Sequence, residues 1–523
     1  MPEPLKNRPD NRDLALLAAL LAIGIIVFEL WMATTDHDNS RDQHLGGAVA
    51  YAKGHIDLLR PMLPGFNANG TPTPLEFPIW QALTAGLMKC FGIWFGWGNV
   101  VSLFFFFSSL AALFDLCRRI CSVRTAWWAV VFSLLQPLST MIGGQAGGDS
   151  TAWAFAMWFI YFCYRMMNDA GWHWWAAALL MGCLSATTKA PFFMTAGLTS
   201  FLWLLLRHRQ SLRAWLFLGS AGIVCILVFV VWNHHCQRIY GEAEFQTIDM
   251  DPSHGDINRW YFGTLAYRLN LHNWLRGGWH LLCVVFGCLA FLIGPLLCLR
   301  LKLAAEAWLF LLAAVCTTMI FTPLLMEHVH YFFIYAPAAA WLCAIPAAEF
   351  EFSIWNRLQT SMLARVAILL VTFSAAWAET AMAIHFNLGF DDYFSKSARI
   401  IQEHTAQTDK LIVWGQVWGD PFLRADRQGL TGGLDLRSTG WIDDPAKLER
   451  MQQLGYTKLV LMNPSPFVVA LTTAVGQHGE KLEDLHQYLP VVAKAWPVVL
   501  DSPQIFIVQI PPLPAGPARE NQK

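Results

Sequence analysis

The sequence contains few charged residues. Only 14% of its 523 residues are Asp, Glu, Lys or Arg, whereas 55% are hydrophobic and the mean hydropathy is +0.39. Because a soluble domain carries about 25% charged residues, this chain lacks the charge needed to cover a water-facing surface. The composition therefore excludes an ordinary soluble protein and predicts a polytopic α-helical membrane protein surrounded by membrane lipids.

Other features are scarce or missing as well. The formal net charge is −1 and no basic tail or face stands out, so we expect no nucleic-acid partner. The cysteines fall between Cys90 and Cys343, mostly inside apolar segments, which indicates no disulfide framework. The glycine-rich run 143–148 lacks the Gly-Lys-Ser/Thr ending of a nucleotide-binding loop and therefore predicts a closely packed turn. No internal repeat is visible.

Long apolar segments are present instead. Segments of about 17 to 25 apolar residues can cross a bilayer as helices, and the chain contains about eleven of them. They lie near 14–34, 98–117, 125–142, 150–165, 173–188, 191–206, 214–232, 279–298, 304–323, 329–347 and 363–385. The first is predicted to be an uncleaved anchor, because no small-residue cleavage pattern follows it. An odd number of spans places the two termini on opposite sides of the membrane.

Basic residues in short loops orient these spans. Arginines and lysines gather before the first span and in the loops near 118–124, 207–213, 300–302 and 357–365, all on one side of the predicted topology. The positive-inside rule makes that side cytoplasmic. We therefore predict that the first outer loop (about 35–97) and the glycine turn face outward. In a bacterial inner membrane, that side is the periplasm.

The composition changes after residue 385. Apolar runs shorten to strand length at 411–414, 458–462 and 505–508, and helical patterns lie near 395–404 and 445–454. The second helical pattern ends at Gly455, as expected of a helix C-cap. We predict a membrane domain over 1–385, followed by a small extracytoplasmic α/β domain over 386–523 that ends in a disordered tail.

Three carboxylates on the predicted outer side are candidates for catalysis or metal binding. Asp42 follows the first span, but an exposed loop charge would explain it equally well from spacing alone. Glu76 has apolar neighbours, among which an unpaired carboxylate would be costly. Asp149 precedes the fourth span, where it could instead be an ordinary helix N-cap.

Cationic and aromatic side chains on the same side are candidates for binding phosphate. Lys189 lies in a short outer loop, where it could contact a phosphate or anchor the chain at the interface. Arg259 and Arg268 lie in an outer loop that could equally be an amphipathic interfacial segment. His328 and His330 could bind a metal or donate to phosphate, although interfacial histidines are common.

Several motifs taken together resemble the GT-C glycosyltransferases. The motifs are Asp42 past the first span, Phe77-Pro78-Ile79-Trp80, Asp149 after the third span, His330-Tyr331-Phe332-Phe333, and the stretch from Phe422 to Gly429. The most similar branch contains the protein O-mannosyltransferases and the lipid A aminoarabinose transferase. One departure is Gln43, because the family often has Glu after the first Asp.

The resemblance implies transfer of a sugar from a polyprenyl-phosphate donor to an extracytoplasmic glycan, lipid or protein, with inversion. The acceptor hydroxyl must lose a proton, and a carboxylate base contributes about 10²–10⁴-fold to such a step. We assign this base to Asp42, with Asp149 as the second catalytic candidate. The leaving phosphate needs cations, for which Lys189, Arg259, Arg268 and His330 are candidates.

A divalent cation is a candidate cofactor, with Glu76 and His328 as its predicted ligands. A membrane transporter or lipid flippase is the alternative function, since such proteins also combine many spans with buried charges. The two functions differ in where ionisable residues meet. We expect them at the outer boundary in a transferase and halfway through the bilayer in a transporter.

Overall fold

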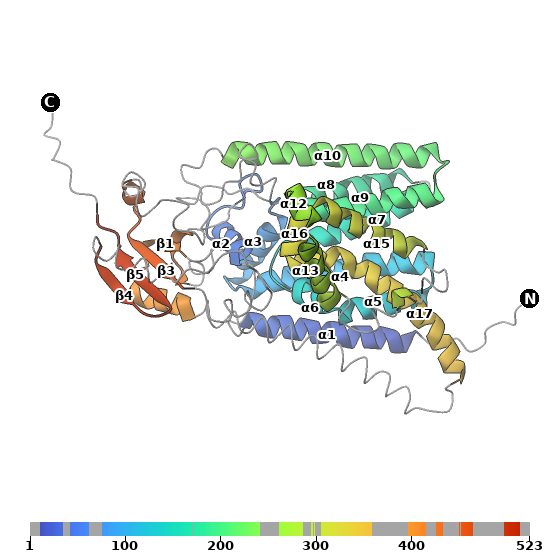
Figure 1. Cartoon of the computed structure of the whole chain (residues 1–523), viewed down its shortest axis with the longest axis horizontal. Helices are drawn as coiled ribbons and strands as arrows, with labels where there is room; N and C mark the ends of the chain where they lie inside the picture. Colours follow the sequence, from blue (N-terminus) through green and yellow to red (C-terminus); the bar gives the residue numbers. More distant parts are fainter. Residues whose placement is uncertain are drawn as a thin grey trace, which may run out of the picture. The chain divides into compact units, whose positions relative to one another are not determined.

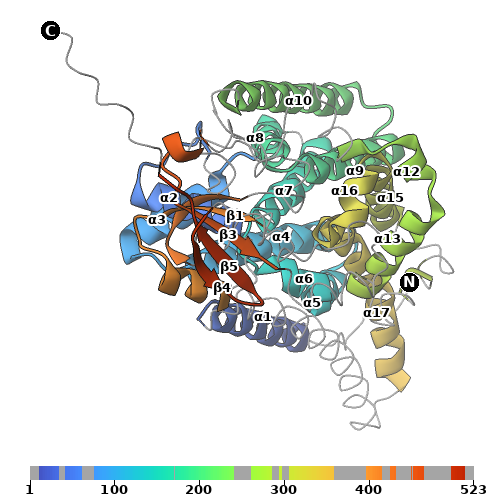
Figure 2. The same ribbon diagram turned by 60° about the vertical axis from the view of Figure 1, so that its left-hand side comes forward.

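A computed structural model of the chain describes residues 11–34, 42–61, 76–169, 171–240, 261–285, 294–296, 298, 305–357, 396–414, 425–431, 449, 451–463 and 496–512. The chain forms two compact units (Figures 1 and 2). Unit 1 comprises Met1–Met32, Gly96–His234 and Asp251–Ile384. Unit 2 comprises Ala33–Phe95, His235–Met250 and His385–Lys523. The first outer loop and the C-terminal segment thus belong to one unit.

Unit 1 is a helix bundle. Its helices are α1 (Arg12–Thr34), α4 (Gly96–Ile120), α5 (Val123–Leu135), α6 (Pro137–Gly143), α7 (Asp149–Asn168), α8 (Trp172–Thr188), α9 (Ala190–Arg207), α10 (Leu212–Tyr240, which runs on into unit 2), α12 (Leu265–Leu269), α13 (Leu271–Val284), α15 (Ala305–Ile320), α16 (Thr322–Glu327), the 3₁₀ helix η3 (Val329–Tyr335) and α17 (Ala336–Arg357). Helix α7 packs against α4, α8 and α9. Its buried alanines, Ala152, Ala154 and Ala156, allow close approach of the neighbouring backbones.

The bundle has the surface of a membrane protein. Among the described residues, five helices are long and apolar enough to cross a bilayer: those containing Arg12–Trp31, Gly96–Ile120, Ala190–Arg207, Leu212–Ile239 and His330–Glu349. Large apolar side chains are exposed along α1 at helical spacing, at Leu16, Leu20, Ile23, Val27 and Trp31. Such a stripe suits contact with lipid. The prediction of a polytopic helical fold is confirmed.

Two predicted spans differ from the helices that form. The span predicted at 125–142 is broken between α5 and α6, because Pro137 has no N–H with which to continue the first helix. The buried side chain of Gln136 at this break donates a hydrogen bond to Ala336 O (2.9 Å). The span predicted at 329–347 begins as the tighter η3 and becomes α-helical only at Ala336. The span predicted at 363–385 lies outside the described residues.

Unit 2 contains two helices that the sequence analysis did not predict. These are α2 (Asp42–Lys53) and α3 (Ile79–Phe91), both within the predicted outer loop. They pack on each other through buried side chains that include Leu45, Ala48, Trp80 and Ala85. The outer loop is therefore partly folded.

The C-terminal part of unit 2 is built on a mixed sheet (Figure 2). Its strands are β1 (Lys410–Trp414), β2 (Gln428–Thr431), β3 (Lys458–Met462), β4 (Val498–Asp501) and β5 (Ile505–Gln509), in the order β2-β1-β3-β5-β4. Strand β1 pairs in parallel with β2 and β3, whereas β5 is antiparallel to β3 and β4. The three strands predicted from apolar runs form β1, β3 and β5, which confirms the α/β fold class.

Local signals explain two helix ends around this sheet. Gly455 has a φ of +82°, and the pair of hydrogen bonds from Tyr456 N to Met451 O and from Gly455 N to Gln452 O makes a Schellman cap, as predicted. Helical backbone over 396–404 ends where Arg427 donates to the side chain and carbonyl of Thr405 (3.0 and 2.8 Å). Arg427, in the 422–429 motif, thus anchors the turn before β2 to this helix end.

Candidate functional site

A buried ion pair joins Asp149 and Lys189 in unit 1. Asp149 is the first residue of α7, and Lys189 is the single residue between α8 and α9. The side chains are only 5% and 3% exposed, respectively. Charges withdrawn from water this far are tolerated when they are paired, because either one alone would carry a large desolvation cost. The fold thus brings together two candidates that the sequence analysis had considered separately.

The backbone explains how both residues reach this position. Lys189 is extended (φ −149°, ψ 105°), which separates α8 from α9, and its carbonyl accepts the first amide of the new helix from Phe192 (3.1 Å). Gly148, not Asp149, is the N-cap residue of α7, so the alternative of a simple side-chain cap is wrong. Burial of Lys189 likewise excludes a lysine that extends to the membrane interface.

Aromatic rings cover the pair. The Nζ atom of Lys189 lies 5.0 Å from the centre of the Tyr331 ring, a cation–π distance. Phe192 lies 6.0 Å from Tyr331, and Trp153 lies 5.6 Å from Phe192, measured between ring centroids. His330 is 4.3 Å from Tyr331 by the same measure. An apolar wall therefore shields the charges on the side of η3 and α9.

His328 and His330 stand at the beginning of η3. Both side chains are half-buried, and their ring centroids are 5.6 Å apart. Imidazoles in this position can donate hydrogen bonds to an anion or bind a metal. Within the described ranges, however, no group of three or more His, Cys, Asp or Glu side chains is arranged to hold a metal ion.

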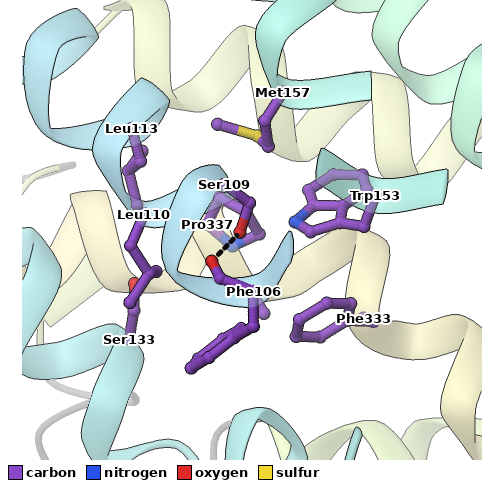
Figure 3. A pocket seen from close by; sticks show the side chains of 10 residues that line it. Phe106, Ser109, Leu110, Leu113, Ser133, Trp153, Met157, Phe333 and Pro337 are labelled. Atoms are coloured by element: carbon purple, nitrogen blue, oxygen red, sulfur yellow. Dashed lines mark hydrogen bonds between the residues drawn. The ribbon is translucent and has the colours of Figure 1, made fainter. Parts of the chain in front are cut away.

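A small cavity lies further along α7 (Figure 3). It is lined by Trp153 and Met157, which follow Asp149 at intervals of four residues on one helix face, and by Phe106, Ser109, Leu110, Leu113, Ser133, Phe333, Ala336 and Pro337. The Ser109 hydroxyl donates to the Phe106 carbonyl (2.7 Å). The cavity has room for about one water molecule, too little for a sugar ring. It is a packing cavity, not a substrate site.

Of the two phosphate ligands predicted in the third outer loop, Arg259 and Arg268, the structure describes only the second. Arg259 lies outside the described residues. Arg268, on α12, donates from Nε to Phe262 O (2.6 Å) and from Nη2 to Ile320 O (2.9 Å), which holds this loop against the end of α15. Two of its five N–H donors are used in this way. Its role as a phosphate ligand stays a prediction.

Asp42 and Glu76 belong to unit 2. Asp42 is the first residue of α2, and the half-buried Glu76 lies two residues before Pro78, the N-cap of α3. The two helices are joined by a buried contact of 3.0 Å between His44 Nδ1 and Gln81 Nε2. With the amide as donor, the ring carries its proton on Nε2. The two acidic residues thus lie at or just before the starts of two helices that pack on each other.

Two further residues of unit 1 were not selected as candidates from the sequence. Tyr331 was noted only as part of a motif, although its ring covers Lys189. Glu29 is buried in α1, at 5% exposure, although an ionisable residue inside an apolar span is by itself a signal of function.

Comparisons with known proteins identify the fold. No family model matches the sequence, and no curated protein sequence matches it at a significant level. The crystal structure of ArnT from Cupriavidus metallidurans in the apo state matches with a TM-score of 0.60 and 13% identity, over 94% of this chain and 98% of that one. The same protein bound to undecaprenyl phosphate also gives 0.60, with 14% identity over 97% and 99% of the two chains.

A more distant match is the Archaeoglobus fulgidus oligosaccharyltransferase in the apo form. Its TM-score is 0.50 at 10% identity, over 86% of this chain and 69% of that one. Identities this low show the fold and leave the reaction to be argued from the site. The chain has a GT-C-like membrane fold, as predicted.

Proposed function

We propose that the protein is a membrane glycosyltransferase that transfers a sugar from a polyprenyl-phosphate donor to an extracytoplasmic glycan, lipid or protein. The observation that carries the proposal is the buried Asp149–Lys189 pair beneath Tyr331. It occurs in a chain whose fold matches, over 97% of its length, a protein whose structure was solved with undecaprenyl phosphate bound.

The surroundings of Lys189 suit a phosphate. Helices α7 and α9 both begin at the ion pair, and the partial positive charge of a helix N-terminus favours anions. In this proposal the phosphate of the sugar donor binds Lys189, and His330 donates a further hydrogen bond to it. Asp149 acts as a positioning residue that holds the ammonium group and balances its charge while the lipid is absent.

Asp42 is proposed to accept the proton of the acceptor hydroxyl as its oxygen attacks the anomeric carbon. The bond from that carbon to the phosphate oxygen breaks, and the lipid phosphate leaves with the electron pair. A direct attack opposite the leaving group inverts the anomeric configuration. A phosphate leaves readily as an anion and needs no general acid, so one base is sufficient.

Additional positive charge is proposed for the leaving phosphate. Arg259 and Arg268 are the protein's own candidates, because guanidinium groups bind phosphate through paired hydrogen bonds. Replacing Arg268 with Ala should weaken donor use more than it lowers thermal stability, and Lys should rescue poorly. A divalent cation would supply further positive charge when bound, and Glu76 and His328 stay the ligands predicted for it from the sequence. Transfer measured after chelation, with Mg²⁺, Mn²⁺ or Zn²⁺ added back, tests that prediction.

The transporter alternative is less well supported. Two ion pairs that tie separate helices together in the described part of unit 1 lie at helix ends: Asp149–Lys189, and Arg207–Glu306, which joins the end of α9 to the start of α15. A transporter site built from ionisable residues would be expected near the middle of the bilayer. The orientation predicted from the basic loops places Asp149 and Lys189 on the outer side, which we propose is the periplasmic side of a bacterial inner membrane.

The proposal can be tested with purified protein. The protein is incubated with a panel of polyprenyl-phosphate pentoses, hexoses and amino sugars, together with envelope lipids and glycans as acceptors. Mass spectrometry should detect one transferred sugar in the wild type. Transfer should be lost in Lys189→Met and retained in Arg209→Ala, a matched change at an exposed basic residue elsewhere in unit 1. Movement of the lipid-linked sugar across the bilayer of vesicles that contain the protein, without any transfer of the sugar to an acceptor, would support the flippase and overturn the proposal.

A further inference from the structure

Glu29 is a buried carboxylate inside an apolar helix. After Arg12 and Asp13 at the start of α1, it is the only charged residue of the helix, and it lies on the same helix face as the buried Ala18 and Ile25. An ionisable group inside a membrane segment is costly, so its position needs a physical reason. The reason lies in what Glu29 contacts.

Glu29 lies directly against the backbone of the glycine turn before α7. A Cβ atom added at Gly144 would lie 2.2 Å from Glu29 Cγ and 2.8 Å from its Oε1, distances that no side chain could occupy. On its other side, Asn99 Nδ2 donates to Glu29 Oε2 (3.4 Å). The buried Asn99 Oδ1 has no hydrogen-bond partner among the described residues.

The glycine turn over 143–148 is held from several directions. The Ser102 hydroxyl donates to Gly147 O (3.3 Å), and the Ser150 hydroxyl donates to Ile142 O (2.8 Å) and Gly143 O (3.0 Å). Buried loops are unusual because their backbone polar groups need partners away from water. Here the partners come from α4 and α7, while Glu29 fixes the first half of the turn. The residue that follows the turn is Asp149.

We propose that Glu29 is a positioning residue for the Asp149–Lys189 pair and that it acts through the glycine turn. This inference rests on the proposed function of the pair in donor binding. Because Gly144 is five residues from Asp149, a displaced turn moves the start of α7 and the carboxylate with it. A displacement of about 1 Å in a binding constellation can cost roughly 100-fold in activity.

The contact between Glu29 and Gly144 can be tested by adding a methyl group at one position and removing bulk at the other. Gly144→Ala should raise the Kd for undecaprenyl phosphate about tenfold or more, because the new methyl group displaces the turn. Adding Glu29→Ala should recover much of that loss by making room. Glu29→Gln keeps the shape and the oxygen that accepts from Asn99, so it should bind nearly as the wild type does. The control is Gly219→Ala on α10, where an added Cβ would meet nothing within 4 Å.

Two outcomes would overturn the inference. One is wild-type affinity for undecaprenyl phosphate in both Gly144→Ala and Glu29→Ala. The other is loss of thermal stability with unchanged affinity in the folded fraction, which would make Glu29 only an anchor for α1.

Failure of the proposed function has a different signature, because wild-type protein would then not bind undecaprenyl phosphate at all. The inference is still tested in that case by thermal unfolding of Glu29→Ala, Asp149→Asn and the double variant. Positioning through the turn predicts non-additive shifts in the midpoint, and additive shifts would contradict it.

Discussion

Replacing the Asp149–Lys189 pair with apolar residues separates its structural role from its role in donor binding. Lys189→Met leaves a carboxylate that is 5% exposed without its partner, and Asp149→Leu does the same to an ammonium that is 3% exposed. Breaking a buried pair in this way costs about 3–5 kcal/mol. The double variant buries no unpaired charge, so its stability should equal that of the wild type or exceed it by about 1–4 kcal/mol.

The affinity for the lipid donor should not change in parallel with stability. A hydrogen bond to a charged group contributes about 1.5–3 kcal/mol, which corresponds to roughly 10- to 140-fold in Kd. The two variants that lack Lys189 should therefore bind undecaprenyl phosphate more weakly, by about that factor or more. The double variant is decisive, because it combines a stable fold with a lost phosphate contact.

Thermal unfolding in detergent and titration with undecaprenyl phosphate would be measured on the same preparations. The chain's 25 tryptophans, of which Trp153 packs beside the site, provide the fluorescence signal. The matched control is Arg207→Met with Glu306→Leu, a pair at other helix ends. Binding by the Asp149→Leu/Lys189→Met double variant with wild-type affinity would refute a phosphate site at Lys189.

Three further predictions test unit 2 and the topology. Asp42→Asn should nearly abolish transfer while donor affinity and thermal midpoint stay unchanged, and wild-type turnover in this variant would remove Asp42 from the mechanism. In intact cells an impermeant thiol reagent should label a variant that keeps only the exposed Cys90, whereas a variant that keeps only the exposed Cys121 should react after permeabilisation; the reverse pattern would invert the topology. A hydrogen bond from Lys53 lowers the pKa of Asp426, and the two side chains are half-exposed. The pair therefore stabilises the fold at pH values above the carboxyl's ordinary pKa of about 4, and this stabilisation is lost as the pH falls through the lowered pKa. Asp426→Asn should cost at most about 1 kcal/mol at pH 7 and nothing in strong acid, and a cost independent of pH in unfolding experiments would exclude this pair as the cause.

Composition and local pattern were sufficient to predict the class of protein and many of its elements. Apolar length predicted the helices that became α1, α4, α7, α8, α9 and α10, because a bilayer requires that length whatever the neighbours are. Short apolar runs predicted β1, β3 and β5, and Gly455 predicted a helix end. These are local properties, since hydrogen bonding along a helix and the left-handed backbone of a glycine involve only nearby residues.

The site could be predicted only as scattered candidates. Asp149 and Lys189 are separated by all of α7 and α8, and only the antiparallel packing of these helices brings the two charges together. Packing of η3 and α1 against this part of the bundle places Tyr331 over Lys189 and Glu29 against Gly144. A local pattern can indicate that a carboxylate is unusual, but it cannot indicate its partner. Partners far apart in the sequence are chosen by the tertiary packing that buries them, because burial is what makes an unpaired charge too costly to remain alone.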